Sequence, residues 1–161
     1  MSSMKVLSLC LMIISAPALG QSAPVLSSGQ LLYLPIYSHV WHGEVDRKGQ
    51  PTKSLVSVLV SVRNTDISKP IQLLSAQYYD TDGRKIKEYV DPPRTIGPMG
   101  TYELFVPRSD DTGGSGANFV IAWKSDAAVN APVVEAVHIN LPAGRSIAFI
   151  TSAREIAAGR R

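Results

Sequence analysis

Cysteine is almost missing from this chain, since Cys10 is the single example among 161 residues. It lies in residues 1–20, where Lys5 precedes the apolar run Val6 to Ile14 and small residues lead up to Gly20. This pattern is typical of a secretory signal peptide that is cleaved after Gly20. The mature chain would then have no thiol, which excludes disulfides, thiolate metal ligands and a cysteine nucleophile. A chain without cysteine also suits an oxidising compartment, such as the periplasm or the extracellular space.

Long hydrophobic runs and clustered charges are lacking as well. The run Val6 to Ile14 is shorter than the roughly 20 residues that a helix needs to cross a bilayer, so we expect no membrane span in the mature form. Cys10 lies too early in this run, behind the bulky Leu9, to be a lipidation site. Without the leader, 15 basic and 13 acidic residues remain, and three of the basic ones lie in the last eight positions. Nucleic-acid binding requires a basic stripe with interleaved aromatic residues, so this class of function is excluded.

Helical periodicity is absent beyond the leader, and short segments of period two occur in its place. Val56 to Val62 place a valine at every second position, and Phe119 to Trp123 are apolar throughout, as in a central strand covered on both sides. Further strands are expected at residues 32–37, 71–79, 84–90, 101–106, 132–139 and 146–151. Seven or eight short strands between turn signals predict an all-β protein, an antiparallel β-sandwich of immunoglobulin-like type, with a closed barrel as the alternative.

The domain organisation follows from this pattern. We expect a signal peptide at residues 1–20, a linker at 21–30, one β-sandwich domain at 31–152 and a flexible C-terminal tail at 153–161. Trp123 resembles the core tryptophan of such sandwiches, although the cysteine pair of a true immunoglobulin domain is missing. Pro35 cannot donate a ladder hydrogen bond, which predicts an edge strand or a bulge.

A polar loop with three glycines precedes the central strand. These glycines, within residues 113–116, permit either tight turns or the close approach of a ligand, and both readings stay open. Asp110 and Asp111 are hard oxygen donors that suit calcium or another small ligand, or else solvated turn residues. A nucleotide loop and a nucleophile elbow around Ser115 would each lead into a helix, whereas this loop leads into a strand, so neither fits this context. We predict a ligand-binding surface of Asp110, Asp111, Ser115 and Asn118 together with the aromatic Trp41.

Histidines are the candidate metal ligands. Neutral imidazoles bind copper or zinc, and the chain contains His39, His42 and His138. Residues three apart on a regular strand point to opposite faces, so His39 and His42 can share a metal only if the chain bends between them. The alternative is that all three are ordinary strand-end and surface residues, because the matched spacing of a metal motif is absent.

Glu135 lies in a strand whose two faces both carry a polar residue. One face contains Val133, Glu135 and Val137, and the other contains His138. A buried carboxylate must be paired, for which Arg63 and Lys124 are available, unless Glu135 lies on an exposed face. No second carboxylate is positioned to form an acid–base pair with it, and no catalytic constellation is present, so we expect no enzymatic activity.

Five segments together resemble one protein family: YLPIYSHVWHG, SVRNTD, YYDTDGRKIKEYVDPP, DDTGGSGANFVIAWKSD and VEAVHI. On these residues the chain is similar to domain of unknown function 3124, a family of bacterial secreted proteins, from Tyr33 to about Ser152. The resemblance implies a small exported or membrane-anchored β-domain that is often lipidated. This sequence departs from the pattern because it has no convincing lipidation motif, and the resemblance implies no activity.

These observations together predict a periplasmic or secreted β-sandwich that acts by binding, without a cofactor. Its expected partner is another envelope protein or a small ligand. The alternative is a periplasmic protein that binds copper or zinc through its histidines.

Overall fold

The computed structural model describes residues 25–144 and 146–157, so the predicted signal peptide lies outside the described part of the chain. The described residues form twelve strands. They contain no helix, and therefore none with the length and hydrophobicity that crossing a membrane requires. The strands are β1 (Leu26–Pro35), β2 (His39–His42), β3 (Thr52–Leu55), β4 (Ser57–Arg63), β5 (Ile71–Tyr79), β6 (Lys85–Glu88), β7 (Arg94–Ile96), β8 (Thr101–Val106), β9 (Asn118–Asn130), β10 (Val133–Asn140), β11 (Ile147–Ser152) and β12 (Arg154–Ile156).

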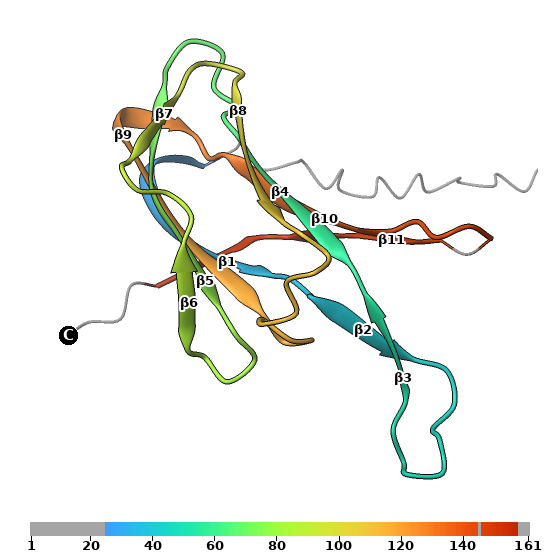
Figure 1. Cartoon of the computed structure of the whole chain (residues 1–161). Coiled ribbons are helices and arrows are strands. Elements are labelled where there is room, and N and C mark those ends of the chain that lie inside the picture. Colours follow the sequence, from blue (N-terminus) through green and yellow to red (C-terminus); the bar gives the residue numbers. More distant parts are fainter. Residues whose placement is uncertain (1–24, 145, 158–161) are drawn as a thin grey trace, which may run out of the picture.

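Two antiparallel sheets form a β-sandwich, and β2 and β3 pair separately as a hairpin (Figure 1). The larger sheet has the order β12-β1-β9-β5-β6, with β7 also paired to β5, and the smaller one has the order β11-β10-β4-β8. The all-β sandwich predicted from the sequence is confirmed. The strand count exceeds the seven or eight expected because β2, β3, β7 and β12 were not predicted. These four strands are only three or four residues long, and such short strands leave little periodicity to detect.

The core lies between the two sheets and is built by alternate residues of the long strands. The valines at positions 56, 58, 60 and 62 are all fully buried, as are Phe119 and Ile121. Trp123 is 2% exposed, and its indole Nε1 donates a hydrogen bond to Gln30 Oε1 at 3.2 Å. The strand β9 lies between β1 and β5, so the prediction of a central strand with a core tryptophan is confirmed.

Both ends of the predicted domain extend further than expected. The first strand begins at Leu26, inside the segment predicted as a linker, and Arg154–Ile156 form β12 inside the segment predicted as a flexible tail. The backbone of β12 pairs with residues 31–33 of β1. Gln30 Nε2 adds a hydrogen bond to Glu155 Oε2 at 2.9 Å. Main-chain pairing of this kind needs no apolar pattern, which is why the sequence did not reveal it.

Pro35 does not mark an edge strand, so that prediction was wrong. The strand β1 has β12 on one side and β9 on the other. The pairing of β1 with β12 ends at Tyr33, and Pro35 is the last residue of β1. At Pro35 no residue of β12 lies opposite, so the missing N–H of proline breaks no hydrogen bond to β12. The irregularity in β1 falls between Ser27 and Gly29 instead.

Glu135 and His138 lie on opposite faces of β10. Glu135 is on the outer face, half-buried, where Arg63 Nη1 donates a hydrogen bond to its Oε2 at 2.9 Å. His138 is on the inner face and fully buried. Arg63 is therefore the partner of Glu135, one of the two that the sequence offered.

Candidate functional site

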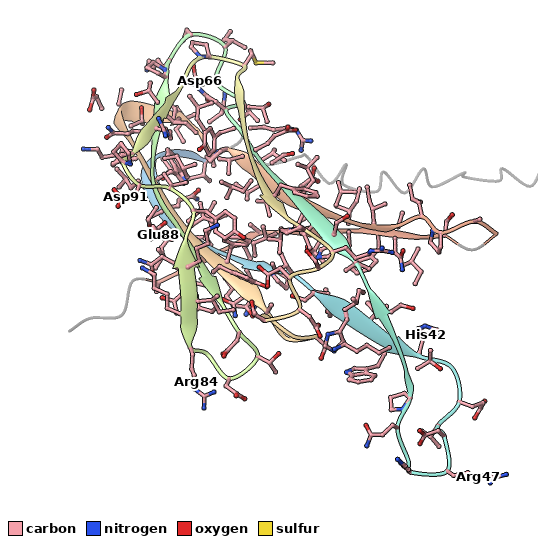
Figure 2. The ribbon with its side chains drawn as sticks, viewed as in Figure 1. His42, Arg47, Asp66, Arg84, Glu88 and Asp91 are labelled. Carbon is pink, nitrogen blue, oxygen red and sulfur yellow. The ribbon has the colours of Figure 1, made fainter. Side chains whose placement is uncertain are left out.

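A hairpin formed by β2 and β3, residues His39–Leu55, extends away from the sandwich and is called the arm here (Figure 1). Its tip is a turn in which Asp46 Oδ1 accepts hydrogen bonds from the N–H groups of Lys48 and Gln50, at 2.7 and 2.9 Å. Gly49 has a φ of 76°, which glycine adopts without strain. Figure 2 shows Arg47 at this tip. No strand was predicted from the sequence between residues 38 and 55.

The two faces of the arm carry different side chains. Directly opposite residues of an antiparallel pair point to the same face, and successive residues alternate. One face carries His39, Trp41, Lys53 and Leu55, and the other carries Val40, His42, Thr52 and Ser54. His39 and His42 therefore point to opposite faces, as their spacing predicted.

The glycine-rich loop holds the base of the arm. The N–H of Ser38 donates to the carbonyl of Gly114 at 2.9 Å, and the Ser38 hydroxyl lies 3.0 Å from the Tyr78 hydroxyl. A Cβ atom on Gly113 would lie 2.0 Å from that same Tyr78 oxygen. The loop thus needs glycine for close approach to a buried tyrosine of its own chain, and Gly114, with a φ of 76°, supplies a turn conformation.

Four side chains meet where the arm joins this loop, and they are called the arm-base cluster. His39 Nδ1 lies 2.6 Å from Asp111 Oδ1, and Lys53 Nζ donates to Asp111 Oδ2. The ring of Trp41 packs edge-on against that of His39 with centroids 4.9 Å apart, and Lys53 Nζ lies 5.9 Å from the Trp41 ring centroid. His39 is 6% exposed whereas Trp41 is 47% exposed. The cluster therefore presents one large aromatic ring to solvent on a polar support, in which His39 is buried and Lys53 and Asp111 are partly exposed.

Electrostatics keep this support charged. Partial burial raises the pKa of the Asp111 carboxyl, but hydrogen bonds and charge from Lys53 and His39 outweigh it, so the pKa lies below its usual value. The carboxylate is the acceptor that both neighbours share. It fixes the ring of His39, and through that ring the position of Trp41.

The other predicted loop residues do not join the cluster. Asp110 Oδ1 accepts from the N–H and the hydroxyl of Thr112, at 3.1 and 2.5 Å, within its own turn. Ser115 is half-buried in the loop, and Asn118 is the half-buried first residue of β9. The two carboxylates expected for calcium thus turn to different partners. Among the described residues, no group of three His, Cys, Asp or Glu side chains converges in a way that could hold a metal ion.

The three histidines make separate contacts. His42 Nε2 lies 2.8 Å from the Ser54 hydroxyl on the far face of the arm, which is the face opposite to His39 and Trp41. His138 Nε2 accepts a hydrogen bond from the N–H of Tyr37 at 3.1 Å, and its ring stacks on Phe149 at a centroid distance of 4.3 Å. A copper or zinc site would require these histidines to converge on one point, and the described contacts do not bring them together.

A hollow of about 680 Å³ lies beside the far face of the arm. Its lining combines His42, Thr52 and Ser54 of the arm with Asn140 at the end of β10 and Ile147 at the start of β11. Polar and apolar groups line it together, and more of the lining surface is apolar than polar.

A second sequence segment, Asn64 to Asp66, has a structural role. The Asn64 amide donates to the carbonyls of Lys69, Ile96 and Gly97, at 2.8, 3.2 and 2.9 Å. Hydrogen bonds from the N–H groups of Ser68 and Lys69 lower the pKa of Asp66. These bonds close the loops at the end of the sandwich far from the arm (Figure 2).

Sequence reasoning found three members of the arm-base cluster and missed the fourth. Trp41 and Asp111 were predicted as ligand-binding residues and His39 as a metal ligand. Lys53 was missed because its position opposite Trp41 depends on the pairing of β2 with β3. No local pattern in the segment before β4 indicated that pairing.

Comparison with known proteins agrees with the sequence resemblance. The family model described as protein of unknown function (DUF3124) matches residues 29–156, and no curated protein matches the chain. A solved structure, described as the crystal structure of Thermotoga maritima 1070, aligns with 80% of this chain and 96% of that chain, with 9% identity and a TM-score of 0.43. The matched residues run from β1 to β12 and so include the arm, the glycine-rich loop and both sheets. This chain therefore belongs to the DUF3124 family.

Proposed function

We propose that this protein is a non-enzymatic binding module of the bacterial envelope that contacts another envelope protein through the arm-base cluster. The observation that carries the proposal is the half-exposed Trp41, whose ring is held by His39 and Lys53 on the shared carboxylate of Asp111. Exposed tryptophans are enriched among residues that dominate binding energies at protein interfaces. A ring that is already fixed loses little freedom on binding, which favours affinity.

The chemistry of the cluster supports binding over catalysis. The pair of His39 and Asp111 resembles the base and the orienting carboxylate of a hydrolase triad. His39 is nearly buried beside Trp41, however, and Lys53 contacts the carboxylate of Asp111 rather than the imidazole. Among the described residues, no hydroxyl or thiol is hydrogen-bonded to His39 as a nucleophile would be. We infer that the pair positions the aromatic ring.

Photo-crosslinking tests the proposed contact. With a photoreactive phenylalanine analogue at position 41, we expect an adduct with one envelope protein in the native bacterium. The matched control places the analogue at Ile86, which is exposed on β6 in the other sheet. Once the partner is identified, Trp41→Ala should weaken binding by about 2 kcal/mol, roughly thirtyfold, because it removes the anchor. Adducts of equal yield at both positions, or none at position 41, would contradict the proposal.

Export is tested by the intact mass of the protein from the envelope fraction. We expect the mature chain to begin at Gln21, because the leader pattern places the cut after Gly20. A chain that keeps its first twenty residues would contradict cleavage. The native mass of the same sample also tests the metal alternative. Bound copper or zinc that disappears in His39→Ala would favour that alternative over the binding module.

A further inference from the structure

The outer face of the smaller sheet carries a row of apolar side chains that crosses all four strands. In the pairing register Phe105 of β8 lies opposite Leu59 of β4, Leu59 opposite Val137 of β10, and Val137 opposite Ile150 of β11. The two ends of the row are the most exposed, Phe105 at 56% and Ile150 at 62%. Because the solvent face of an antiparallel sheet is usually polar, a continuous apolar row on it indicates a partner.

The surface on the two sides of this row differs in charge. On one side a hollow of about 690 Å³ is lined mainly by apolar residues, among them Pro107 and Leu141, and Arg108 is the only charged residue of its lining. On the other side lies the exposed Glu103, two residues before Phe105 on the same strand. The nearby pair of Arg63 and Glu135 is already neutralised by its own hydrogen bond. The face thus has one cationic and one anionic edge with an apolar row between them.

We propose that two copies of this chain pair face to face through this sheet, about a twofold axis that runs along the apolar row. A rotation about this axis lays the apolar row of one protomer against the same row of the other. It also exchanges the two edges of the face, so Glu103 of one protomer faces the Arg108 edge of the other. Contacts through a twofold axis must be self-complementary, and this face meets that requirement in both hydrophobicity and charge. Stacked sheets normally pack about 10 Å apart, which suits a row of Phe, Leu, Val and Ile side chains.

The size of the face predicts a weak dimer. Four strands about 4.8 Å apart and six residues long present roughly 14 by 20 Å, which is about 280 Å² in projection. This area is well below the roughly 800 Å² that each partner buries in a standard interface. We therefore expect dissociation in the micromolar range.

Pairing would also make the protein bivalent. The arm leads through Val56 into β4 at Ser57, on the same side of the row as Arg108. The twofold axis places the second arm at the opposite side, so one dimer presents two arm-base clusters that point away from each other. Two linked sites raise the apparent affinity for a partner that is itself repeated on a surface.

Sedimentation velocity of the mature chain over the micromolar range tests the pairing. We expect a concentration-dependent shift from monomer to dimer. Phe105→Glu should weaken the dimer at least tenfold because it places a charge in the apolar row. Ile86→Glu, an exposed apolar position on the other sheet, is the matched control and should leave the dimer unchanged. Circular dichroism and thermal unfolding confirm that each variant folds.

Charge reversal tests the twofold arrangement itself. Glu103→Arg and Arg108→Glu should each weaken the dimer, and the double variant should restore it, since opposite charges face each other again. A protein that stays monomeric throughout the range overturns the proposal. A dimer unaffected by Phe105→Glu, or one that the double reversal does not restore, overturns it as well. None of these results depends on the arm, so the proposed function is tested separately.

Discussion

Replacement of Gly113 by alanine is expected to destabilise the protein by about 3 kcal/mol, a large fraction of the stability of a typical domain. The added Cβ would lie 2.0 Å from the hydroxyl oxygen of Tyr78 and 2.7 Å from the Cβ of Ala117. Tyr78 cannot move aside, because it is fully buried and its ring stacks on Phe119 with a centroid distance of 5.2 Å. The loop cannot move either, because the Gly113 carbonyl accepts hydrogen bonds from the N–H and the hydroxyl of Thr81, both at 3.0 Å.

Denaturant unfolding of a chain that begins at Gln21 measures this loss. Gly97→Ala is the matched control, since nothing lies within 4 Å of a Cβ added there, and we expect it to change stability by less than about 0.5 kcal/mol. In a Tyr78→Phe background, which lacks the nearest clashing atom, Gly113→Ala should cost less than in the wild type. Equal losses for Gly113→Ala and Gly97→Ala would show that the loop relaxes freely and does not clamp the arm.

Acidification is expected to destabilise the protein through His138, by about 3 kcal/mol between pH 6.5 and pH 4. Burial lowers the pKa of this imidazole from 6.5 to about 4. Its Nε2 accepts the hydrogen bond from Tyr37 N–H, so the folded state keeps the ring neutral. The unfolded chain binds a proton near pH 6.5, whereas the folded chain does so only near pH 4. Stability is therefore complete above pH 6.5 and declines as the pH falls through this interval.

Comparison with His138→Gln isolates this contribution. Carboxylates also lose stabilising contacts in acid, but they do so in both proteins, so the difference between the two pH profiles belongs to His138. We expect the variant to lose less stability than the wild type on acidification, whatever its stability at neutral pH. Parallel profiles would mean that the imidazole titrates in the folded state close to its ordinary pKa.

The strands of the sandwich core were predictable because their signal is local. Val56 to Val62 and Phe119 to Trp123 each bury alternate or successive side chains, and a period of two can be read from a few adjacent residues. The turn at Asp80 to Gly83 was predictable for the same reason, since Gly83 takes the left-handed φ of 78° that a hairpin turn requires. The three-residue strand β12 and the arm could not be found in this way. The pairing of β12 depends on backbone hydrogen bonds to β1, which is distant in the sequence. The arm pairs two strands of only four residues each, which are too short to show a clear period of two.

The sequence by itself determined that this protein is all-β, which strands build its core, and which aromatic, acidic and histidine residues could form a site. The tertiary structure alone decided which of them meet. Asp111 contacts His39 across 72 positions of the sequence and Lys53 across 58. His138, by contrast, is buried against Tyr37 and Phe149 and takes no part in this cluster. Such contacts depend on strand register and on loops that close over long separations, whereas the side-chain pattern of a strand reports only which face is buried.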